Sequence, residues 1–220
     1  CLCAQAAGGG PIYVDVRQYG ARGNGTTDDT AAIQAAIDAA TSGGTVYFPP
    51  GTYIIGSKLD VSGVGLRLLG AGMVASQIKW KNATPQTGTN SMIHIYRATD
   101  NYTGWHIDKL TLNGNSQTPI LYVGNLKGGF IDNVWFYGGT THAIRLDNSH
   151  YSSISHSKVQ QMTGDGLVLN GASANKMSFT SFHNVAGRCV LYVAAGNGDW
   201  YGPENTFETI GTAFEVPKLA

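Results

Sequence analysis

Four segments of the sequence repeat one pattern: HIDKLTLNGN at 106–115, FIDNVWFYGG at 130–139, SISHSKVQQM at 153–162 and KMSFTSFHNV at 176–185. The second residue of each segment is apolar, and these residues, Ile107, Ile131, Ile154 and Met177, follow one another at intervals of 24, 23 and 23 residues. A weaker copy begins at Phe207, after the insertion GNGDWYGPE at 196–204. A fixed period of this length is typical of proteins built from stacked repeats.

Each repeat predicts two short strands. The first has apolar residues at positions 0 and 5, and the second at positions 13 and 15, which aligns Ile120 and Tyr122 with Ile144/Leu146, Leu167/Leu169 and Val190/Tyr192. One unit cannot bury its inward side chains alone, but stacked units can, with equivalent strands about 4.8 Å apart. We therefore expect an all-β fold, a single-stranded right-handed parallel β-helix. The alternative, a β-sandwich, needs antiparallel hairpins at about half this spacing.

The N-terminal part predicts a cap on this solenoid, which we place at 11–55, with the coils at 56–216. DDTAAIQAAIDAA at 28–40 predicts the one strong helix, with an apolar stripe through Ile33 and Ile37 and acidic residues at its positive start. Short strands are expected at 12–16, 45–48, 53–55 and 59–61.

Composition excludes several classes of protein. The 220 residues carry 14 Lys and Arg against 14 Asp and Glu, and 42% are hydrophobic. A chain without a basic surplus is a poor binder of nucleic-acid phosphates, and one this apolar is not disordered. No run of eighteen apolar residues predicts a membrane-spanning helix.

The first ten residues, CLCAQAAGGG, differ from the rest. Ala4-Gln5-Ala6 fits the small residues before a signal-peptide cleavage site, which predicts an extracellular or virion-associated protein; a flexible start is the alternative. The three cysteines, Cys1, Cys3 and Cys189, form neither a disulfide framework nor a metal-ligand spacing.

DVRQYGARGNGTTDDTAAIQAAIDAA at 15–40, followed by GGTVYFPPGTYII at 43–55, resembles the opening of the pectate-lyase superfamily of right-handed β-helices. That superfamily includes polygalacturonase-like enzymes, exo-glucanases and phage tailspike depolymerases. Asn24 stands where the family more often has Asp. The resemblance implies the fold and a polysaccharide partner, but not the chemistry, because members include hydrolases, lyases, epimerases and non-catalytic virion parts.

The family's catalytic motifs are largely missing. TGDG at 163–166 is the one echo of the polygalacturonase motifs, and VWFYGG at 134–139 approaches the Trp-Ile-Asp-His run of pectate lyases without its Asp and His. Neither mechanism can therefore be transferred residue by residue.

One row of the repeat offers candidate catalytic residues. Position 11 is His142, Asp165 and Arg188 in consecutive units, so we expect them at the same corner of adjacent coils. Asp165 would act as acid or base with His142 as its partner, and Arg188 would hold a sugar carboxylate. One carboxylate with His and Arg suits a lyase slightly better than a hydrolase, which needs two carboxyl groups. A purely structural ladder of hydrogen bonds is the alternative.

The outward positions of the first strand predict a sugar-binding face. Aromatic rings there can stack on sugar rings while polar neighbours bind hydroxyls. The candidates are Trp135, Tyr137, His156, Lys158 and His183. Packing beneath a loop or against another subunit is the alternative reading.

These observations predict a polysaccharide-recognising protein, with polysaccharide lyase or glycoside hydrolase as its candidate activity. The alternatives are a non-catalytic virion appendage or decoration protein and a glycan-binding module. We expect no cofactor; Ca²⁺ is conceivable, although no loop of oxygen ligands is visible. Residues 207–216 begin another coil, so we expect that the natural protein continues or that a homo-oligomer, such as a trimer, covers this end.

Overall fold

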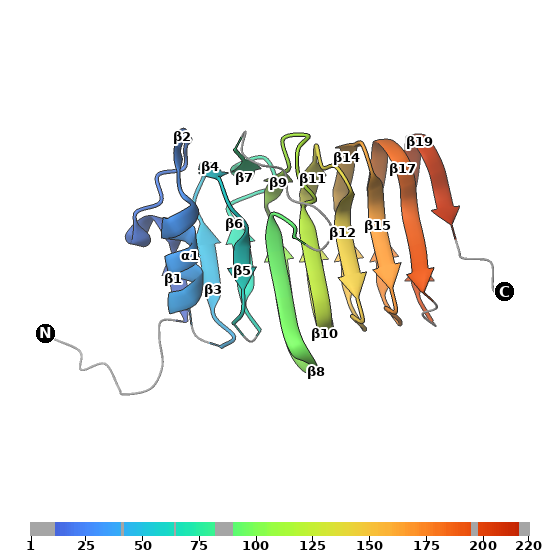
Figure 1. Ribbon diagram of the computed structural model, residues 1–220, viewed down its shortest axis with the longest axis horizontal. Coiled ribbons are helices and arrows are strands. Elements are labelled where there is room, and N and C mark those ends of the chain that lie inside the picture. Colours follow the sequence, from blue (N-terminus) through green and yellow to red (C-terminus); the bar gives the residue numbers. More distant parts are fainter. Residues whose placement is uncertain (1–11, 41, 64, 82–89, 195–197, 216–220) are drawn as a thin grey trace, which may run out of the picture.

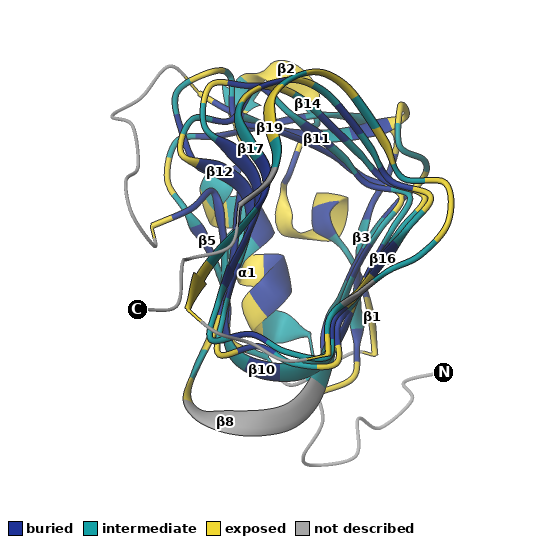
Figure 2. Ribbon diagram, turned by 90° about the vertical axis from the view of Figure 1, so that its right-hand side faces the viewer, coloured by how far each residue is buried: buried dark blue, intermediate teal, exposed yellow. Residues whose placement is uncertain are grey.

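The computed structural model describes residues 12–40, 42–63, 65–81, 90–194 and 198–215. Its strands wind into a three-sided tube whose coils follow the sequence from one end to the other (Figures 1 and 2). Every pairing between the described strands is parallel, which confirms the right-handed parallel β-helix and excludes the sandwich.

Three parallel sheets form the sides of the tube. Sheet 1 contains β1 (Tyr13–Asp15), β3 (Thr45–Phe48), β6 (Arg67–Gly70), the later parts of β8 (Ile93–Asp108) and β10 (Leu121–Asp132), β13 (Ser153–Ser155), β16 (Lys176–Ser178) and β18 (Trp200–Tyr201). Sheet 2 contains β2 (Asn24–Asp28), β4 (Gly51–Ile55), β7 (Ser76–Trp80), β9 (Thr111–Asn113), β11 (Trp135–Tyr137), β14 (Lys158–Met162) and the first parts of β17 (Ser181–Ala194) and β19 (Thr206–Glu215). Sheet 3 contains β5 (Leu59–Val61), the first parts of β8 and β10, β12 (His142–Asp147), β15 (Asp165–Asn170) and the later parts of β17 and β19.

Each full coil has three sides rather than the two strands expected. The predicted first strand bends in the middle, at Lys109, Asn133, His156 and Phe179, whose φ angles are 56°, 53°, 45° and 50°. This left-handed conformation turns the chain from sheet 1 into sheet 2. The predicted register of the repeat is nevertheless correct on both sides of the bend, since Ile131 pairs with Ile154, and Phe136 with Val159.

In the predicted second strand the register is wrong by one residue in one coil. Leu121, not Ile120, pairs with Ile144, and Val123 pairs with Leu146. Because strand residues alternate between the two faces, Leu121 and Val123 are buried inside the tube and Tyr122 points to its outer side.

The cap is built around α1 (Thr30–Ala39), which is shorter than the predicted 28–40 and closes the N-terminal end of the tube (Figure 2). Ile33 and Ile37 lie on the buried face of this helix. A short 3-10 helix, η1 (Val16–Tyr19), precedes β2. Asn24 accepts bonds from the backbone N–H groups of Thr26 (3.1 Å) and Thr27 (2.9 Å), so it supplies an acceptor where the family more often has Asp.

Residues 1–10, with the predicted cleavage site, lie outside the described residues, and the domain boundaries stay predictions. In the ranges that the structure covers, no helix has the length and apolar character needed to cross a membrane.

Candidate functional site

The structure places the predicted catalytic residues on consecutive coils. His142 pairs with Asp165 across β12 and β15, and Asp165 binds Arg188 on the next coil. Asp165 Oδ1 accepts bonds from the backbone N–H of Arg188 (2.9 Å) and from its Nε (2.8 Å), while Oδ2 accepts from Nη2 (2.8 Å). Both carboxylate oxygens are thus engaged by Arg188, and Asp165 is 8% exposed.

His142 is buried inside the tube. Its Nε2 lies 3.0 Å from Ser91 Oγ, and its Nδ1 has no hydrogen-bond partner among the described residues. Burial, helped by the positive charge of Arg145, lowers the pKa of His142 to about 3, although Asp165 acts in the opposite direction. His142 is therefore neutral at neutral pH and is bonded to Ser91 rather than to Asp165. The catalytic roles of His142, Asp165 and Arg188 stay predictions.

Four of the five predicted sugar-binding residues share the outer face of sheet 2. Trp135 pairs with Lys158, whose Nζ lies 5.2 Å from the indole centroid. Tyr137 packs edge-on against Trp135 at 5.4 Å. His183, two coils further along the row of Tyr137, has Nδ1 3.2 Å from a carboxylate oxygen of Glu208.

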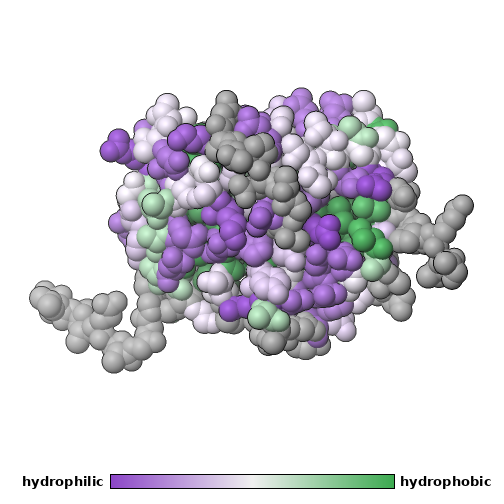
Figure 3. Space-filling model, in the orientation of Figure 1, coloured by the Kyte–Doolittle hydropathy of each residue, from purple (hydrophilic) through white to green (hydrophobic). Residues whose placement is uncertain are grey.

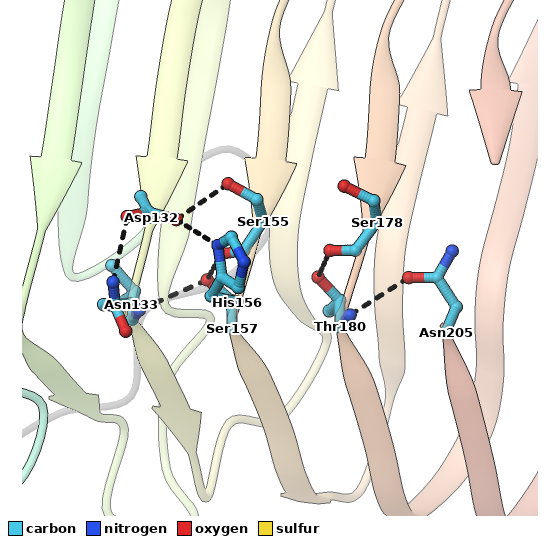
Figure 4. Close-up of polar contacts among 9 residues, drawn as sticks. Asp132, Asn133, Ser155, His156, Ser157, Ser178, Thr180 and Asn205 are labelled. Atoms are coloured by element: carbon cyan, nitrogen blue, oxygen red, sulfur yellow. Dashed lines mark hydrogen bonds and ion pairs between the residues drawn. The ribbon is translucent and has the colours of Figure 1, made fainter. Parts of the chain in front are cut away.

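His156, the fifth residue, lies at the bend between sheets 1 and 2 (Figure 4). Its Nδ1 is 2.8 Å from Asp132 Oδ1, and its ring stacks on Phe179 with centroids 5.0 Å apart. Burial acts to raise the pKa of Asp132, but hydrogen bonds from His156, Ser155 and Asn133 hold it below its usual value. Further hydrogen bonds continue this ladder along the bend, as Figure 4 shows. Ser157 Oγ accepts from the backbone N–H of Val134, the Thr180 hydroxyl donates to the backbone carbonyl of Ser178, and Asn205 Oδ1 accepts from the backbone N–H of Thr180. The binding roles of these five residues stay predictions.

A further cluster, missed by the sequence analysis, lies on the outer face of sheet 3. Asp60, His94, Tyr122 and Arg145 form one row across four coils, because each pairs in register with the next. A second row contains Tyr96, Gly124 and Asp147. The incorrect register placed Tyr122 inside the tube, and this hid the row.

Two rings and two ion pairs organise this cluster. The His94 ring stacks on Tyr122, with centroids 5.1 Å apart and planes 10° apart. His94 Nδ1 lies 3.0 Å from Asp60 Oδ1, which also lies 2.8 Å from Lys58 Nζ. Arg145 donates from Nε and Nη2 to the two oxygens of Asp147, at 2.8 and 3.3 Å.

The environment sets the protonation of the two stacked rings. Burial and the nearby Lys58 lower the pKa of His94, although Asp60 opposes them. Burial and the negative charge of Asp147 raise the pKa of Tyr122 to about 12, although Arg145 acts against them. At neutral pH the cluster therefore holds a neutral imidazole, which can accept a proton, beside a protonated phenol, which can donate one.

Two hollows that share Asp60 lie on the cap side of this cluster. A hollow of about 210 Å³ is lined by Asp60, Val61, Ser62, His94 and Tyr96. A larger one of about 900 Å³ lies beside the cap and shares Asp60 with it. Figure 3, which has sheet 3 in front, shows polar surface over the middle of this face and an apolar patch toward the C-terminal coils. Among the described residues, no three His, Cys, Asp or Glu side chains gather as metal ligands would.

The fold and these polar rows define a solenoid of the pectate-lyase type. The chain belongs to the family described as rhamnogalacturonase A/epimerase, pectate lyase-like, whose model matches residues 13–216.

Three known proteins are similar to this chain in sequence or in fold. Mannuronan C5-epimerase AlgE4 of Azotobacter vinelandii is 33% identical over 162 residues, which are 70% of this chain and 27% of that protein. The solved structure of the AlgE4 A-module is 26% identical and has a TM-score of 0.58, over 85% of this chain and 58% of that one. Alginate lyase 7 of the same bacterium is 33% identical over 162 residues, 68% of this chain and 18% of the relative. ORF18 of Geobacillus virus E2 has a TM-score of 0.73 at 24% identity, over 90% of this chain and 42% of that one, which shows a shared fold.

The chain spans between 7 and 27% of the length of the curated epimerases it matches.

Proposed function

We propose that this chain modifies an acidic polysaccharide outside the cell, by removing the proton next to the carboxylate of a uronic acid residue. The observation that carries this proposal is the row of Asp60, His94, Tyr122 and Arg145 on sheet 3, which combines a base, an acid and a cation. The printed activities of two relatives, a mannuronan C5-epimerase and an alginate lyase, support the same substrate class.

The chemistry assigns one role to each group. Neutral His94 accepts the proton from C5, and the electron pair left behind spreads into the sugar carboxylate. The Arg145 guanidinium neutralises the charge that grows there, which is the usual requirement of this step. The Tyr122 hydroxyl then donates a proton to O4 as the C4–O4 bond breaks and the C4=C5 double bond forms, which completes a β-elimination.

Glycoside hydrolysis fits this face less well. It requires two carboxyl groups across the scissile bond, one of them protonated. Asp60 is held by Lys58 and His94, and Asp147 by Arg145, so both carboxylates are paired with cationic or basic groups.

Incubation in D₂O with a panel of polysaccharides tests the proposal. The panel contains mannuronan, polygalacturonate and rhamnogalacturonan, with a neutral glucan as the control. We expect deuterium at C5 or unsaturated products that absorb in the ultraviolet, from an acidic polymer and not from the glucan. New reducing ends without either signal would indicate a hydrolase instead.

If the folded protein gives no product and no exchange on any acidic polymer, the proposal fails. Binding without product would then favour a glycan-binding module, and neither binding nor product a virion appendage. The trimer predicted from the sequence stays a prediction, which sedimentation of the same protein would measure.

A further inference from the structure

We propose that the larger hollow beside the cap binds the sugar residues that adjoin the reacting one, so that the polysaccharide lies across the coils of sheet 3 and ends its path at α1. This inference rests on the proposed function. Its starting point is that Asp60 lines both hollows. The part of a polymer that extends beyond His94 and Tyr96 toward the cap would therefore enter the cap hollow.

The lining of the cap hollow suits hydroxyl and carboxylate groups. It holds two exposed or half-exposed ion pairs: Lys81 Nζ lies 3.4 Å from Asp28 Oδ2, and Lys58 Nζ lies 2.8 Å from Asp60 Oδ1. Exposed pairs of this kind contribute little to stability, so a ligand can replace them at small cost. The lysines offer donors for a sugar carboxylate, and the aspartates offer acceptors for sugar hydroxyls.

Gly56, one of the lining residues of the hollow, is held in place by a hydrogen bond to Thr30. The Thr30 hydroxyl donates to Asp28 Oδ1 at 2.6 Å and accepts from the backbone N–H of Gly56 at 2.8 Å, which ties the turn after β4 to the start of α1. A Cβ on Gly56 would lie 2.6 Å from Asp28 Oδ2 and 3.6 Å from Lys81 Cδ. The glycine thus leaves open the space between the two charged groups.

The arrangement predicts a dependence on chain length. Adjacent coils are about 4.8 Å apart, so each further sugar residue reaches roughly one coil further toward the cap. A short oligomer fills the hollow at His94, while a longer one also reaches Lys81. Longer oligouronates should therefore bind more tightly and be modified with a higher kcat/KM.

Oligouronates from two to eight residues test this inference, with kcat/KM measured on the wild-type chain and affinity measured by calorimetry in the Tyr122→Phe background. Ser57→Trp places a bulky ring at an exposed position in the lining, and Lys81→Ala removes one donor. Lys79→Ala is the matched control, because Lys79 lies within β7 of sheet 2, pairs with Asn113 and does not line the hollow. We expect the two groove variants, Ser57→Trp and Lys81→Ala, to bind the long oligomers about tenfold or more weakly than the unsubstituted background. Their affinity for the disaccharide should be unchanged.

The outcomes separate this inference from the proposed function. Equal affinity of the wild type and the groove variants for long oligomers, with normal activity, would overturn the cap subsites and leave the reaction in place. An equal loss for the disaccharide would also overturn them, since the variants would then act on the reaction centre itself. If no acidic oligomer binds or reacts with the wild type, both the reaction and the subsites are refuted.

Discussion

The imidazole of His94 lies face to face with the phenol ring of Tyr122, with planes 10° apart, because the two residues pair in register on adjacent coils. A solenoid creates such neighbours without any sequence motif, since a separation of 28 residues along the chain becomes one inter-strand spacing in space. In the same way, the next coil places Arg145 beside Tyr122.

The first prediction concerns the Tyr122 hydroxyl. Tyr122→Phe keeps the ring on His94 and removes only the proton donor, so we expect kcat to fall by about 10²-fold or more, as is typical for loss of a general acid. The midpoint of unfolding should change little. Tyr96→Phe is the control, since the Tyr96 ring lies 5.8 Å from His94 and 6.5 Å from Tyr122 and is 43% exposed. Comparable losses of kcat in the two variants would contradict the assignment.

The second prediction is that substitution of Gly124 lowers kcat about as much as substitution of Tyr122. A Cβ at this position would lie 2.7 Å from the Tyr122 hydroxyl and 2.8 Å from a ring carbon of Tyr96, so Gly124→Ala must displace the phenol. We expect a loss of kcat close to that of Tyr122→Phe. The double variant should be little worse than either single one, because both act through the same hydroxyl. Multiplied losses in the double variant would show that Gly124 acts in another way.

The coils could be predicted from the sequence because their inward residues recur with a regular period. Ile131, Ile154 and Met177 are apolar for a single physical reason, burial in a continuous core, and they lie in neighbouring coils as expected. The cap was predictable for a similar reason, because Ile33 and Ile37 form the apolar stripe of α1 and are buried in the core.

The site on sheet 3 could not be placed with the same certainty, since outward residues obey no common rule. Two consecutive apolar residues, Ile120 and Leu121, made two registers equally plausible, and both are buried in the structure. Only the backbone pairing decides between them. A clue was nevertheless present in HIYR at 94–97, where His94 and Tyr96 alternate with buried Ile95.

Asp165→Asn separates the two candidate reaction centres. If Asp165 is the acid or base predicted from the sequence, activity is lost while the protein stays folded. If sheet 3 carries the reaction, kcat persists, and the variant loses stability because the two-pronged contact with Arg188 is weakened. Loss of such a charged hydrogen bond costs about 1–3 kcal/mol. Urea unfolding and initial rates, measured on the same preparation, give both quantities.

The last prediction concerns acid sensitivity. The pKa of His142 is about 3 in the folded chain and near 6.5 in the unfolded chain, so between these values the unfolded chain binds a proton that the folded chain excludes. The free energy of unfolding attributable to His142 should therefore be complete above pH 6.5 and should fall as the pH drops toward 3, by at most about 1.4 kcal/mol per pH unit. Burial also lowers the pKa of His94, so the comparison must be made against a variant rather than read from the wild type alone.

His142→Gln provides this comparison, since its amide can still bond Ser91 but does not titrate. Urea unfolding from pH 7 to pH 4 should give a smaller decline in the variant than in the wild type. The variant is expected to be less stable at pH 7, because glutamine fills the buried site less well, and the difference should narrow or reverse at pH 4. Parallel curves for the two proteins would mean that the His142 imidazole is protonated as readily in the folded chain as in the unfolded one.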